Sequence, residues 1–187
     1  MMIFKMGGGV FGFLAAMGLR ANPDARAAVL LRALDSVAGI SAQVLDANEI
    51  AGFGHLQAAA LMASNAWANK TNVSRSPATE ALVYASAKRQ IKEAISTIGV
   101  HPGSQLWAVI GIGKPGADAE PLERCASRFG TQDDTLLEMS EEKACGITES
   151  FQIGGAEVSI AEKLTGSRLE AIQSLVIERV ALSEFRR

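Results

Sequence analysis

This chain of 187 residues contains few aromatic residues and little cysteine. Aromatic side chains make up 5% of it, and its two cysteines, Cys125 and Cys145, form neither a C-x-x-C pair nor a cluster with histidine. A broad platform of stacked rings for single-stranded nucleic acid is therefore not expected, and neither is a structural zinc site. We expect both thiols to be reduced, as is usual in the cytoplasm.

The chain also lacks a strong charge of either sign. It carries 18 lysines and arginines against 20 acidic residues, a formal net charge of −2 at pH 7. A global attraction to nucleic acid is not expected, although a local contact remains open. The apolar stretch from Met6 to Leu19 is too short to cross a bilayer, and its glycines argue against a signal-peptide core. We expect a cytoplasmic protein that does not associate with membranes.

No set of catalytic residues is apparent. The two histidines, His55 and His101, are accompanied by no G-x-S-x-G motif or other nucleophile pattern. Paired acids such as Glu141 and Glu142 are typical of the first turn of a helix, where they face the positive end of the helix dipole. We therefore expect a protein that is not an enzyme and binds no cofactor or metal.

A formal G-x-G-x-x-G at Gly7, Gly9 and Gly12 leaves an alternative open, a small-molecule or nucleotide-binding α/β enzyme that uses this glycine-rich stretch. In a dinucleotide fold such glycines follow a full strand, open a helix and precede an acid at the end of a second strand. Here the preceding strand is short, and Asp35 lies within a helical pattern. The glycines therefore favour a bulge or close backbone packing.

Apolar periodicity predicts a single α+β domain over 1–187, a small, mostly antiparallel sheet packed with several helices. Strands are expected over 2–13, 42–45, 105–112 and 136–139. Helices are expected over 22–39, 55–68, 76–98, 120–129 and 140–151, with a last one from Ser167.

The stretch 69–100 is the most informative part of the chain. Ser76 and Pro77 are typical of a helix N-cap and first helical position, and Gly99 is a typical stop. Apolar residues between them repeat at the spacing of a helix face, which predicts one continuous helix. The loop before it carries Lys70 and Arg75 and no acid.

Three motifs of this chain resemble those of a known family. The central one reads N-x-S-R-S from Asn72, then E-x-L-x-Y-x-S-x-x-R-Q-I-x-x-A-I from Glu80. It is flanked by LDANEIAGFGHLQAAALMA over 45–63 and by ERVAL over 178–182. Together they resemble the small kinase-binding subunit of the KEOPS complex, the PRPK-binding (TPRKB-like) family.

The resemblance implies a non-catalytic regulatory subunit. KEOPS makes N6-threonylcarbamoyladenosine in tRNA, and this family binds and stimulates its small atypical kinase/ATPase subunit. The family also captures the single-stranded 3′ CCA end of tRNA. The partners expected for this chain are therefore that kinase and the tRNA 3′ end. When isolated, the chain is expected to be a monomer or weak homodimer.

Residues of the central stretch and the last helix are candidates for these contacts. A cationic loop at a helix N-terminus suits phosphate. For the kinase we expect an exposed apolar patch, with Leu82 and Ile177 as candidates and the segment 151–160 as a further one. The candidate RNA-binding residues are Lys70, Asn72, Arg75, Ser76, Lys88 and Arg89.

Two charges fall on apolar helix faces, Glu80 on the central helix and Arg179 on the last one. Each is costly to bury unless it is paired. We therefore expect the two helices to pack together with Glu80 and Arg179 as a structural ion pair. An alternative has Glu80 exposed near the loop, paired with Arg75 or Lys88.

Overall fold

The computed structural model describes residues 1–7 and 9–186, and its centre is one antiparallel sheet. Its strands run in the order β1-β2-β4-β3, and β5 pairs with the free end of β2 beyond β1. The sheet therefore confirms the predicted α+β class with an antiparallel sheet. The strands are β1 (Met2–Lys5), β2 (Phe13–Ala21), β3 (Ile40–Asp46), β4 (Leu106–Gly113) and β5 (Gly130–Gln132).

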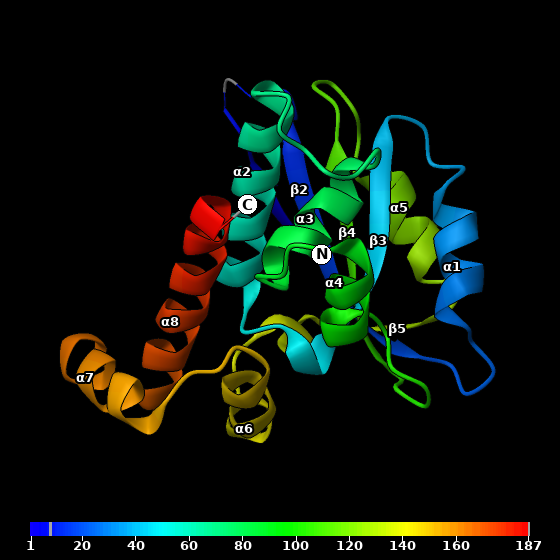
Figure 1. Cartoon of the computed structure of the whole chain (residues 1–187). Coiled ribbons are helices and arrows are strands. Elements are labelled where there is room, and N and C mark those ends of the chain that lie inside the picture. The colour runs from blue at the N-terminus through cyan, green and yellow to red at the C-terminus, as the bar shows by residue number, and fades with distance from the viewer. Residues whose placement is uncertain (8, 187) are drawn as a thin grey trace.

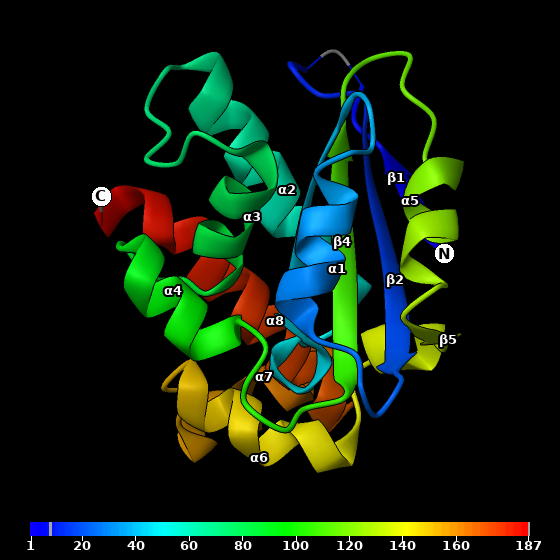
Figure 2. The same cartoon turned by 90° about the vertical axis from the view of Figure 1, so that its right-hand side faces the viewer.

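Helices cover both faces of this sheet (Figures 1 and 2). One face carries α1 (Ala27–Leu34) and α5 (Glu120–Ala126). The other carries α2 (Phe53–Ala68), α3 (Pro77–Ala85) and α4 (Ile91–Ile98), with α8 (Arg168–Leu182) packed against α2. The remaining helices α6 (Glu141–Ser150) and α7 (Gly155–Thr165) pack with α8 in a third apolar cluster. Short 3-10 turns are η1 (Ala47–Glu49), η2 (Asp134–Leu137) and η3 (Ser183–Arg186).

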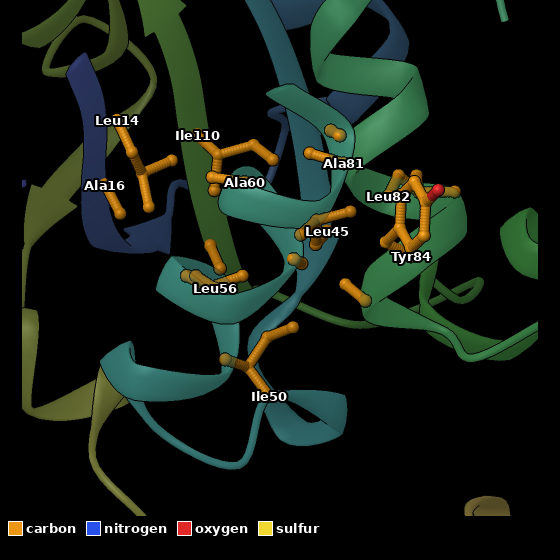
Figure 3. Packing of buried hydrophobic residues seen from close by; sticks show 14 of the residues in the cluster. Leu14, Ala16, Leu45, Ile50, Leu56, Ala60, Ala81, Leu82, Tyr84 and Ile110 are labelled. Atoms are coloured by element: carbon orange, nitrogen blue, oxygen red, sulfur yellow. The ribbon is translucent and has the colours of Figure 1, made fainter. Parts of the chain in front are cut away.

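The central strand β2 is buried on both faces. Leu14 and Ala16 point into the cluster under α2 and α3, as Figure 3 shows, whereas Ala15 and Met17 enter the cluster under α1 and α5. A strand buried on both sides has no polar alternation, so 14–21 read as part of an apolar run and was not predicted as a strand.

The glycine-rich stretch is the connection between β1 and β2. The Met6 amide donates to the Gly12 carbonyl at 3.0 Å, and the Gly12 amide donates to the Gly113 carbonyl at 2.8 Å. Gly7, Gly9 and Gly12 thus join two antiparallel strands and open no helix. This geometry differs from a dinucleotide-binding turn, in which the glycines lead into a helix.

The predicted continuous helix over 76–98 is wrong, because it breaks between α3 and α4. The Ser86 hydroxyl donates to the Val83 carbonyl and accepts the Lys88 amide, and Ala87 adopts a left-handed φ of 52°. A serine side chain that bonds to the local backbone competes with the helical ladder. The two ends were predicted correctly: the Ser76 hydroxyl accepts the Thr79 amide, and Gly99 follows α4.

Three other predictions of elements are corrected. Residues 22–26 form a turn, so α1 starts only at Ala27. The predicted strand over 136–139 is not a strand: its first two residues belong to η2, the last two lie in the loop after it, and the nearby strand is β5. Helix α7 was not predicted; its N-cap and first residue are Gly154 and Gly155, and glycine is a poor helix former.

A buried lysine holds α6 against the turns that follow β3 and β5. The Lys143 ammonium donates to the carbonyls of Leu136 at 2.5 Å, Glu138 at 3.0 Å and Ile50 at 3.4 Å. Burial lowers the pKa of this ammonium to about 8, against the opposing attraction of Asp46 and Glu138. The sequence offered no signal for this contact, since Lys143 sits in a polar helix start.

A buried histidine joins α2 to the ends of two other helices. His55 Nδ1 accepts the Ala51 amide at 3.2 Å, its Nε2 lies 2.7 Å from the Ala85 carbonyl, and its ring meets Phe151 edge-on at 5.5 Å. With one nitrogen accepting, the ring is neutral and Nε2–H donates. Burial lowers the pKa of His55 to about 4, and the bond to the Ala85 carbonyl partly opposes this shift.

We predict that this histidine makes the protein less stable in mild acid. A pKa of about 4 in the folded state, against about 6.5 when unfolded, means that the unfolded chain binds the extra proton first as the pH falls. The free energy of unfolding should fall by about 1.4 kcal/mol per pH unit between these two values, about 3 kcal/mol in all.

Denaturant unfolding from pH 7 to pH 4 measures this slope. His55→Gln, whose side chain does not titrate, is the control. Near pH 5 its free energy of unfolding should change with pH less steeply than that of the wild type, by the equivalent of about one proton. Equal slopes for the two proteins would show that His55 is not held neutral in the native state.

Candidate functional site

The loop 69–76 connects α2 to α3 at one end of the sheet (Figure 1). The Thr71 amide donates to the Ala66 carbonyl at 2.8 Å, Lys70 adopts a left-handed φ of 59°, and Asn72 Nδ2 donates to the Ser74 carbonyl at 2.9 Å. These local bonds fold the chain back on itself between the helices. Because Lys70 and Arg75 are exposed, the loop presents two cations to solvent.

The side chain of Glu80 holds the backbone of this loop by hydrogen bonds. It is fully buried in the first turn of α3, and Oε2 accepts the amides of Val73 at 3.0 Å and Ser74 at 2.7 Å. A carboxylate that accepts two amides is a strong acceptor and fixes the backbone that donates them. The alternative of a solvent-exposed Glu80 is therefore wrong, and the prediction that it faces the interior is confirmed.

Arg179 does not pair with Glu80, as the sequence led us to expect, but with another acid. Arg179 Nη2 donates to Glu157 Oε1 of α7 at 2.6 Å. This contact lowers the pKa of the Glu157 carboxyl, as does the bond from the Gly154 amide. The physical reason is that α7, which the sequence did not predict, supplies an acid beside Arg179, whereas Glu80 is directed toward the loop amides.

The N-cap of α3 links the loop to the sheet. The hydroxyls of Ser76 and Ser41 of β3 lie 2.9 Å apart, and Ser41 Oγ accepts the Ala78 amide at 3.1 Å. The start of α3 is thus fixed both by its own cap and by the edge strand. Ser76 is half-buried and serves this junction.

The structure brings only part of the predicted RNA-binding set together. Lys70, Asn72, Arg75 and Ser76 share the loop, and their role in RNA binding stays a prediction. Lys88 and Arg89 lie beyond the break, at the opposite end of α3. Lys88 is half-buried and lines a polar cavity of about 280 Å³ with Arg179 and the end of α6. A continuous cationic track along one helix is therefore absent.

The predicted apolar contact residues differ in exposure. Leu82 is only 1% exposed and packs beside Tyr84 in the core (Figure 3), so it does not form a surface patch. Ile177 of α8 is half-buried near Gly54 of α2. Other apolar residues are more exposed: Ile95 of α4 at 50% and Leu164 of α7 at 85%, which the sequence did not indicate as contact residues, and Ile160 of α7 at 64%. Ile160 lies in the segment 151–160 that the sequence favoured.

Comparison with known proteins places the chain in a family. The family model for kinase binding protein CGI-121 matches residues 26–184. The chain belongs to the CGI-121 family. A relative named regulatory protein Cgi121, from Methanocaldococcus jannaschii, is 31% identical over 150 residues, which cover 80% of this chain and 87% of the relative.

Membership of the CGI-121 family confirms the resemblance seen in the central motif. The matched range includes the loop 69–76 and every helix from α1 to α8, whereas β1 and β2 lie before it. Within the described residues, no helix is long and apolar enough to cross a membrane.

We predict that Glu80→Ala destabilises the protein and loosens the loop. The amides of Val73 and Ser74 would lose their acceptor, and an unsatisfied buried donor costs about 1–3 kcal/mol. Glu80→Gln, which keeps a side-chain carbonyl as acceptor, should cost less. Denaturant unfolding gives the stability, and hydrogen exchange at the two amides reports the loop. Unchanged exchange in Glu80→Ala would contradict this role.

Proposed function

We propose that this protein is a non-catalytic regulatory subunit of the KEOPS tRNA-modification complex. In this role it binds and stimulates the small atypical kinase/ATPase subunit. The observation that carries the proposal is the match to a kinase-binding family over residues 26–184, together with the name regulatory protein of the relative.

We further propose that the loop 69–76 contacts the 3′ CCA end of tRNA. The supporting observation is a hydrogen-bonded loop with two exposed cations, Lys70 and Arg75, and no acid of its own. The amides of Val73 and Ser74 point inward to Glu80, so they are not available to phosphate. Recognition therefore rests on side chains, with the cations providing a salt-dependent contact.

The role of Glu80 fits this proposal. Its buried carboxylate orders the loop without presenting an acid at the surface, so it supports a phosphate-binding turn structurally. A preorganised loop loses less conformational entropy on binding than a mobile one.

We predict that the isolated protein does not turn over ATP but raises the ATPase rate of its kinase partner. Steady-state phosphate release, measured with each protein alone and with both, tests this. A partner kinase with its catalytic aspartate replaced is the control for contaminating ATPase. ATP hydrolysis by the isolated chain that persists through further purification would contradict the non-catalytic role.

We predict that Lys70→Glu and Arg75→Glu each weaken tRNA binding, with the larger loss at low salt, because phosphate contacts release counterions. Removal of the 3′ CCA end should weaken binding of the wild type. The matched control is Arg128→Glu, the same charge change at an exposed position after α5, on the other face of the sheet.

Fluorescence anisotropy with labelled tRNA at two salt concentrations gives these affinities. Equal affinity of Arg75→Glu and wild type, together with equal binding of full-length and truncated tRNA, would show that the assigned loop is not the RNA site.

A further inference from the structure

The strand β3 forms one edge of the sheet, and its outer side is only partly occupied. It pairs with β4 along its inner side, and an isolated bridge from Leu45 to Gly99 covers its last residues. Its sequence, ISAQVLD, contains no lysine or proline of the kind that usually protects an edge strand from pairing.

The backbone of β3 identifies which groups face outward. The Val44 amide donates to Oε1 of its neighbour Gln43 at 3.0 Å, so it points away from β4. Alternate residues of an antiparallel strand face the same side, so the amide and carbonyl of Ala42 also point outward. Gln43 thus takes the place of the carbonyl that an added strand would offer to Val44.

An apolar groove lies along this edge. Its volume is about 210 Å³, and its lining comes from α1, β3, α3, α4 and the segment after α4. No charged residue lines it. Ile95 of α4 forms part of its wall and is 50% exposed, so its side chain is accessible to an apolar residue placed in the groove.

The flanking helices restrict what can enter. Figure 1 shows β3 between α1 and α4, and residues of both helices line the groove. A second copy of the chain would bring its own α1 and α4 to the same gap, which would keep two β3 strands apart. A single extended segment carries no such flanks and can reach the distance of a sheet ladder, about 4.8 Å.

We propose that the kinase partner adds an extended, apolar segment to β3 and places its side chains in this groove. The segment takes the outward amide and carbonyl of Ala42 and displaces the Gln43 side chain from the Val44 amide. Main-chain bonds supply affinity and the apolar groove supplies selectivity, as in other cases of strand addition. The inference rests on the proposed kinase-binding function and names the surface that performs it.

Two variants of the full chain test the surface by calorimetric titration with the purified kinase partner. Ala42→Pro removes the outward amide, a change that an edge strand tolerates, and Ile95→Asp puts a charge into the uncharged groove. Each should weaken binding at least about tenfold, since one or more hydrogen bonds or an apolar contact is lost. Leu61→Asp, which places the same charge at an exposed apolar position of α2 outside the groove, is the matched control and should bind as wild type does.

Hydrogen exchange supplies a direct readout of the added strand. The Ala42 amide should become protected when the kinase binds, a change that a contact elsewhere would not produce. Thermal unfolding checks that the variants fold. If Ala42→Pro does not fold, Ile95→Asp and the exchange measurement still test the proposal. Ile95 is exposed, so its replacement should not prevent folding.

The possible outcomes separate the two proposals. Binding by wild type that is unaffected in both variants, with no protection of Ala42, would overturn the strand addition and leave the proposed function standing. A wild type that does not bind the kinase would overturn both. A dimer of the isolated chain that Ala42→Pro dissociates, with kinase binding unchanged, would show that the edge pairs with a second copy and would overturn the inference.

Discussion

The buried carboxylate of Glu80 is the contact on which the candidate site depends. It lies on the side of α3 that faces the core, and it accepts hydrogen bonds from the amides of Val73 and Ser74 in the loop. Burying an ionised carboxylate is expensive, and hydrogen bonds to its charged form recover part of that cost. The same two bonds determine the path of the loop that carries Lys70 and Arg75. One side chain therefore joins the apolar core to a loop that presents two cations to solvent.

Burial of the sheet on both faces is the second constraint. Neighbouring segments approach the strands closely only where the strands allow it. Gly18 admits the turn after β5, and Gly111 admits α5. A Cβ at Gly18 of β2 would lie 1.9 Å from the Asp133 carbonyl oxygen, and one at Gly111 of β4 would lie 2.3 Å from a Leu122 methyl. Both positions therefore need glycine for packing, which explains part of the glycine content of the strands without any ligand.

Local features of the fold could be predicted from the sequence, whereas contacts between distant residues could not. The cap at Ser76 and the start of α8 after Ser167 follow from residues within one turn. The break at Ala87 depends on the Ser86 hydroxyl, which a pattern of apolar spacings does not reveal. The partner of Arg179 depends on α7, a helix that was not predicted, so a correct statement about burial of charge led to a wrong partner. The loop residues of the candidate site are consecutive, so the sequence alone places them together. Lys88 and Arg89 lie beyond the far end of α3, after a break that the sequence did not predict, and their role in RNA binding stays a prediction.

The proposed RNA loop and the proposed kinase edge meet at one junction. Ser41 of β3 bonds to the Ser76 hydroxyl and accepts the Ala78 amide, and the next residue, Ala42, faces the open edge. The start of α3 is therefore held between the loop on one side and the edge strand on the other. Because α3 is buried along nearly its whole length, it cannot move freely between them. A partner strand at β3 and an RNA end at the loop would thus bind to a single packed unit, in which Ser41 connects the two surfaces directly.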